Sequence, residues 1–168
     1  MNKKLLLVLG ATIASTGIYS ASLNAATVSS GASANVLAPL AIADGTNQMN
    51  FGDVSGDTTN ATTVILTTLG GTSSLDGANV SGSPTAADFD VTGAGTASYS
   101  ITLPADGDVS LTGPGTAMDV DGFDHDAGGT PALVGGGDSF KVGATLKINA
   151  DQTAGAYSGN YNVIVEYQ

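Results

Sequence analysis

The last fourteen residues of the chain, 155–168, constrain its fold more than any other stretch. Their large side chains fall on one parity: Tyr157, Tyr161, Val163, Val165 and Tyr167. Because successive side chains of an extended chain point to opposite faces, this spacing places all five on one face of a strand. The other face is polar apart from Ile164. An unpaired strand with an apolar face promotes aggregation, so we expect this terminal strand to have a partner.

The first 25 residues have the three-part pattern of a secretory signal peptide. Lys3 and Lys4 precede an apolar core of residues 5–14, and small or polar residues lead to Ala25 and Ala26. This core is short for a membrane span. We predict cleavage after Ala25 or Ala26, export from the cytoplasm, and no membrane span in the mature chain.

The mature chain is acidic and lacks cysteine. Removal of residues 1–25 leaves 143 residues (168 − 25), enough for one domain with a core. Two lysines, Lys141 and Lys147, then remain against 15 acids, a balance that argues against nucleic-acid binding. Without cysteine the chain has no disulfide and no thiol catalysis. The single histidine, His125, argues against a multi-histidine metal site.

Short alternating runs between turn residues occupy the rest of the chain. Examples are 63–69, 87–91, 99–103 and 118–123. Helix-period spacing of apolar residues is missing after the leader, and we find no repeat of fixed length. About nine short strands at this spacing predict an all-β fold, an antiparallel β-sandwich. Residues 70–84 and 124–138 are the predicted long loops.

Two resemblances follow from these residues. Gly155, the alternating residues after it and the penultimate Tyr167 resemble the C-terminal signature of chaperone–usher pilins. Nearly all of the mature chain also resembles a bacterial group known as domain of unknown function 4402. The matching pieces are 36–42, 50–54, 99–104, 118–123 and 141–146.

The pilin resemblance implies an immunoglobulin-like sandwich that lacks its last strand. In that family a periplasmic chaperone supplies a strand first, and the N-terminal extension of the next subunit replaces it at an outer-membrane usher. This chain is accordingly expected to be a structural subunit of a fimbria or pilus, present in the periplasm in transit and then at the cell surface. The residues implied to face the groove, and to bind chaperone or subunit, are Gly155, Tyr157, Tyr161, Val163, Val165 and Tyr167.

Residues 26–38 are the predicted N-terminal extension and residues 39–168 the predicted domain. One parity of the extension carries Val28, Ala32, Ala34 and Val36, with Ser30 as a polar gap. An extended segment of this kind can complete the sheet of another copy by β-augmentation, and head-to-tail exchange grows a fibre.

The extension's small side chains bury little area, so pairing within its own chain stays open. The alternative function is therefore a self-complemented secreted or envelope domain, either a spore-coat-like protein or a carbohydrate-binding adhesin. The absence of tryptophan counts against the adhesin.

The densest acid cluster is Asp119, Asp121, Asp124 and Asp126. Calcium binding is one interpretation, because hard cations prefer several oxygen ligands. However, an EF-hand loop that begins at Asp119 needs an acid or amide at its fifth position and glycine at its sixth. Here Gly122 is fourth and Phe123 is fifth. We favour a strand with aspartates on its outward side, and we predict no metal.

No catalytic constellation is recognisable. His125 has no nucleophile elbow near it, and no motif supports a serine–lysine pair. The glycine-containing stretch 93–98 lacks the third glycine of a dinucleotide loop. We therefore predict a protein that is not an enzyme and uses no cofactor.

Overall fold

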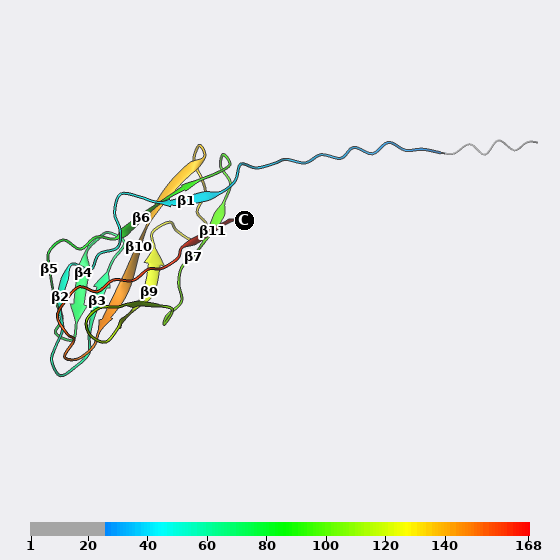
Figure 1. The fold of residues 1–168 in the computed structure, drawn as a ribbon. Coiled ribbons are helices and arrows are strands. Elements are labelled where there is room, and N and C mark those ends of the chain that lie inside the picture. The colour runs from blue at the N-terminus through cyan, green and yellow to red at the C-terminus, as the bar shows by residue number, and fades with distance from the viewer. Residues whose placement is uncertain (1–25) are drawn as a thin grey trace, which may run out of the picture. The chain divides into compact units, whose positions relative to one another are not determined.

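The computed structural model describes residues 26–168, so the predicted signal peptide lies outside the described residues. Residues Val36–Gln168 form a compact unit built entirely from β-strands and loops (Figure 1). This confirms the predicted all-β, sandwich-like fold. Across residues 26–168 there is no helix long and apolar enough to cross a membrane.

Eleven strands are present in the described residues. Their bounds are β1 Ala41–Asp44, β2 Asp53–Ser55, β3 Thr62–Leu66, β4 Thr72–Leu75, β5 Asn79–Ser81, β6 Ala87–Thr92, β7 Tyr99–Thr102, β8 Val109–Leu111, β9 Met118–His125, β10 Gly137–Ile148 and β11 Ile164–Tyr167. All pairings among them are antiparallel.

The long strand β10 organises the main sheet, and it runs through the middle of the unit in Figure 1 (orange). It pairs with β6 over its first half and with β3 over its second half. At Val142 it faces both Ala87 of β6 and His125 of β9, so β6 and β9 lie on opposite sides of it. Strands β1, β4 and β8 extend this seven-stranded sheet.

Two smaller sheets cover the main one. Strand β11 pairs with β7, and β2 pairs with β5. Alternating side chains of β3, β6 and β10 are buried between these layers, as expected for strands with one inner face. The core has two clusters, one around Leu66 and Leu146 and the other around Phe89 and Phe140.

The structure differs from the expectation in one connecting region, and it adds an irregularity within one strand. The predicted loop 70–84 contains β4 and β5, whose polar, partly exposed residues give a weak apolar alternation. In β9, Gly122 and Phe123 face a single residue of β10, which is a β-bulge with Gly122 at a positive φ of 57°.

Candidate groove beside the terminal segment

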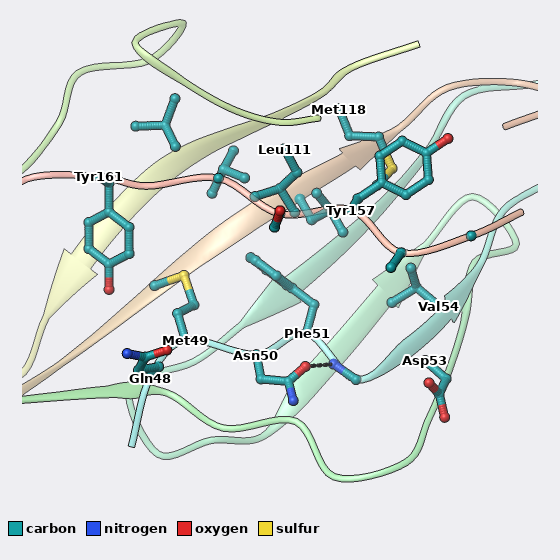
Figure 2. A pocket seen from close by; sticks show the side chains of 18 residues that line it. Gln48, Met49, Asn50, Phe51, Asp53, Val54, Leu111, Met118, Tyr157 and Tyr161 are labelled. Carbon is teal, nitrogen blue, oxygen red and sulfur yellow. Dashed lines mark hydrogen bonds between the residues drawn. The ribbon is translucent and has the colours of Figure 1, made fainter. Parts of the chain in front are cut away.

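Residues 155–168 are here called the terminal segment, and the first half of this segment borders a groove in the described part of the chain. This groove has a volume of about 490 Å³, and its opposite side is formed by residues 48–54, here called the facing wall. Figure 2 shows Tyr157 and Tyr161 on the terminal segment, with Met49 and Phe51 across from them. The two borders are about a hundred residues apart in the sequence, and the fold brings them to the same cavity.

Core side chains of the main sheet form the floor of the groove. Val109, Met118, Val120 and Leu146 line it, and each of these residues is buried. Phe51 of the facing wall is buried in the same cluster. An extended peptide lying in the groove would therefore bury its inward side chains on apolar surface, which is the main source of favourable free energy in such contacts.

Backbone pairing is incomplete on both sides of the groove. The terminal segment is joined to β8 by a bridge between Ser158 and Thr112, and residues 159–163 make no backbone hydrogen bond within the described chain. The facing wall is joined to Thr85 by a bridge at Asn50. Because backbone groups alternate in direction along a strand, those of the neighbours of Asn50 point away from Thr85. Both borders thus offer unpaired backbone groups.

Tyr157 anchors the start of the terminal segment. Its hydroxyl accepts hydrogen bonds from the Gly115 amide at 2.9 Å and from Nε2 of Gln152 at 2.7 Å. The hydroxyl also donates to the Thr153 carbonyl oxygen at 2.8 Å. The bond from Gly115 ties the segment to the loop that precedes β9, and the bonds with Gln152 and Thr153 tie it to the loop that follows β10.

Tyr167 anchors the other end. Its hydroxyl donates to the carbonyl oxygen of Ala38 at 2.9 Å and accepts from the Ala94 amide at 2.6 Å. Strand β11, which contains Tyr167, also carries the regular pairing with β7. The terminal segment is thus held at both ends, and the unpaired residues 159–163 lie between the two anchors.

Tyr161 lies between these anchors and lines a second, smaller cavity of about 180 Å³ as well as the groove. Its ring packs against Phe89 at a centroid distance of 6.4 Å and against Phe123 at 5.2 Å. Burial, followed by the nearby negative charge of Asp44, raises the pKa of Tyr161 to about 12. The hydroxyl is therefore neutral at physiological pH and is available for hydrogen bonding.

Two glycines bring the terminal segment close to its neighbours. A Cβ atom at Gly155 would lie 2.5 Å from Cγ of Pro114, and the φ of 150° also favours glycine. A Cβ atom at Gly159 would lie 2.4 Å from the carbonyl oxygen of Ser110. These close approaches seat the segment against β8 and the loop after it.

The five large side chains predicted to share a face are each partly buried, whereas Ser158, Asn160, Asn162, Ile164 and Glu166 between them are exposed. Regular strand geometry, however, is limited to β11, so the predicted terminal strand over 155–168 is too long. Tyr161, Val163, Val165 and Tyr167 pack on the core of the same chain, and Tyr157 packs on the neighbouring cluster.

The extension carries no strand in residues 26–38, and its side chains are exposed. Val28 and Val36 are 92% and 91% exposed, and Ala32 and Ala34 are exposed as well. The four residues proposed as donor positions therefore remain accessible in the single chain.

The aspartates of β9 do not converge on a common centre. Asp121 is buried, pairs with the ammonium group of Lys147 and accepts a hydrogen bond from the Gly107 amide at 2.8 Å. Asp119 and Asp124 are exposed. No group of three or more His, Cys, Asp or Glu side chains that could hold a metal ion occurs within residues 26–168.

The facing wall is not identified as part of a site from the sequence alone. Residues 50–54 are noted there only as a piece of the resemblance to domain of unknown function 4402, and nothing local shows that Met49, Phe51 and Val54 border the same cavity as residues 155–161. Their apolar spacing was a signal for burial, but the identity of the segment across the cavity depends on the tertiary fold.

Comparison with known proteins gives one match. The sequence model of the family described as a domain of unknown function (DUF4402) matches residues 40–167, which is well over half of the chain. No curated protein and no solved structure matches the chain.

Proposed function

The chain belongs to the family described as a domain of unknown function (DUF4402), and we propose that it is an exported structural subunit of a surface fimbria or pilus. In this proposal the groove beside the terminal segment receives the extension of a neighbouring copy. A periplasmic chaperone occupies the same groove before assembly at an outer-membrane usher. The mature protein is located at the cell surface.

The open groove is the observation that carries this proposal. It combines an apolar floor with two borders that each include backbone groups without a partner in the described chain. An added strand would satisfy those groups and cover the floor, which is the physical basis of β-augmentation. The accessible extension supplies a segment of suitable type, since it is uncharged and has small apolar residues on one parity.

Polymerisation follows from the separation of groove and extension into different parts of the chain. A copy that donates its extension to one neighbour can accept the extension of another neighbour. Such a head-to-tail contact is heterologous and does not close, so it produces a filament. The alternative function is a self-complemented secreted or envelope domain. In that case the extension lies in the groove of its own chain.

The test is gel migration of the mature protein, unheated and boiled, with and without residues 26–36. Polymerisation through the extension is expected to give an oligomer ladder that collapses on boiling and is lost on deletion. A single monomeric band from both proteins would exclude the pilus function and favour the self-complemented domain.

A matched pair of variants makes the test specific for side-chain parity. Ala32→Asp combined with Ala34→Asp would place two charges against the apolar floor and is expected to abolish the ladder. Ser33→Asp combined with Asn35→Asp adds the same charge on the opposite face and is expected to preserve the ladder. Equal loss of the ladder in both variants would show that net charge, and not insertion into the groove, controls assembly.

A further inference from the structure

The Tyr161 hydroxyl is a polar group at the groove without a partner. It makes no hydrogen bond with any residue in the part of the chain that the structure describes, although the ring is packed against Phe89 and Phe123. Figure 2 shows the hydroxyl end of the ring directed from the terminal segment toward Met49 and Gln48 of the facing wall. Polar groups that become buried in an interface are nearly always hydrogen-bonded, so an occupant of the groove is expected to supply a partner.

One inward-parity residue of the extension can form a hydrogen bond with the Tyr161 hydroxyl through its side chain. Among its inward-parity positions from Val28 to Val36, Ser30 alone carries a hydroxyl. Its small side chain also suits a position where the Tyr161 ring already fills the space between the groove and the smaller cavity. We propose that Ser30 of a neighbouring copy lies beside Tyr161 and that the two hydroxyl groups form a hydrogen bond. This inference rests on the proposed function and specifies the register of the donated extension against the terminal segment.

The shape of the groove then sets the direction of the donor. If the extension runs antiparallel to the terminal segment, the residues after Ser30 lie along residues 155–159, where the apolar cavity of about 490 Å³ is located. A parallel extension would place the same residues along β11, to which β1 lies close. The antiparallel direction therefore gives Ala32, Ala34 and Val36 the apolar floor.

This register predicts which outward-facing residues are neighbours. With Ser30 opposite Tyr161 in an antiparallel pair, Gly31 lies opposite Asn160, and both residues are exposed in the single chain. Directly opposed residues have Cα atoms about 4.5–5.5 Å apart, which a disulfide can bridge. A shift of two residues moves the partner by roughly 7 Å along the strand, beyond this range.

Disulfide trapping between copies tests the register, and the chain has no cysteine of its own to interfere. One full mature copy carries Gly31→Cys, and the other carries Asn160→Cys, Asn162→Cys or Ser158→Cys. The copies are mixed under mild oxidation, and linked peptides are identified by mass spectrometry. We expect a covalent dimer linked between positions 31 and 160, and its loss with the two shifted partners.

The possible outcomes distinguish a wrong register from a failure of the proposed strand exchange. A dimer linked only to position 162 or 158 would overturn the register and leave strand exchange intact. The absence of a dimer with all three partners would overturn the register, and if the unsubstituted protein also gives no oligomer ladder, the proposed strand exchange is overturned as well.

Discussion

The hydroxyl group of Tyr167 donates a hydrogen bond to the carbonyl oxygen of Ala38 over 2.9 Å, which joins the penultimate residue of the chain to the region just before β1. The same hydroxyl accepts from the Ala94 amide. A Cβ atom at Gly93 would lie 2.3 Å from the hydroxyl oxygen, so the glycine makes room for this contact. These two bonds fix the C-terminal end of the terminal segment.

Tyr167→Phe removes both hydrogen bonds and leaves the Ala94 amide without its partner. We expect the free energy of unfolding to fall by about 1–3 kcal/mol, the usual cost of an unsatisfied, partly buried polar group. Urea unfolding followed by circular dichroism measures this change. Tyr161→Phe is the matched control, because that hydroxyl has no hydrogen bond within residues 26–168. An equal effect of both substitutions would contradict the anchoring role of Tyr167.

Tyr157→Phe is expected to loosen the other anchor locally. The substitution removes the partner of the Gly115 amide and of the Gln152 side chain. Hydrogen exchange at Gly115 should accelerate by about 5–13-fold, since loss of a hydrogen bond worth about 1–1.5 kcal/mol makes local opening that much easier. Unchanged exchange at Gly115 would show that the loop is held by other contacts.

Gly159→Ala is expected to push the terminal segment away from β8. The added methyl group would lie 2.4 Å from the Ser110 carbonyl oxygen, so the backbone must shift, at a cost of about 1–3 kcal/mol. Thermal unfolding measures the loss. Gly129→Ala is the control, because no atom lies within 4 Å of its added Cβ. If Gly129→Ala destabilises as much, a general effect of replacing glycine is responsible.

The ion pair between Asp121 and Lys147 predicts a dependence of stability on pH. The hydrogen bond from Lys147, followed by that from the Gly107 amide, lowers the pKa of Asp121. Because the folded pKa lies below the unfolded value of about 4, the stabilisation is present above pH ~4 and is lost as pH falls through the folded pKa. Asp121→Asn should therefore lower stability at pH 7 and flatten its decline in acid.

Urea midpoints measured between pH 7 and pH 2 test this dependence. The exposed Asp119, for whose side chain the structure describes no hydrogen bond, provides the control substitution Asp119→Asn. A parallel decline of the Asp121→Asn variant and the unsubstituted protein would show that other carboxyl groups dominate the acid response.

If the chain assembles by the proposed strand exchange, Ser30→Ala and Tyr161→Phe are each expected to weaken the contact between subunits. One hydrogen bond is worth about 0.5–1.5 kcal/mol, which corresponds to a dissociation rate faster by roughly 2–10-fold. The double variant should dissociate no faster than either single variant, since both lose the same bond. Additive effects would contradict the proposed pair, and dissociation can be followed by light scattering on dilution.

Local spacing was enough to predict the class of fold and the inner face of the terminal segment. The alternation of Tyr157, Tyr161 and Val163 depends only on the two-residue period of an extended chain, and the structure has these side chains partly buried. The same reasoning overestimated the length of the strand. Its regular part is restricted to β11 because only there does β7 supply a continuous partner.

The amino-acid sequence by itself determined that this is an all-β protein without disulfides, whose last residues bury one face and whose extension has small side chains on one parity. The tertiary structure decided which segments are neighbours. It placed the facing wall across from the terminal segment, joined Tyr167 to Ala38, and buried Asp121 beside Lys147. The physical reason is that alternation is encoded between adjacent residues, whereas pairing across long separations depends on which arrangement buries the whole apolar surface at once.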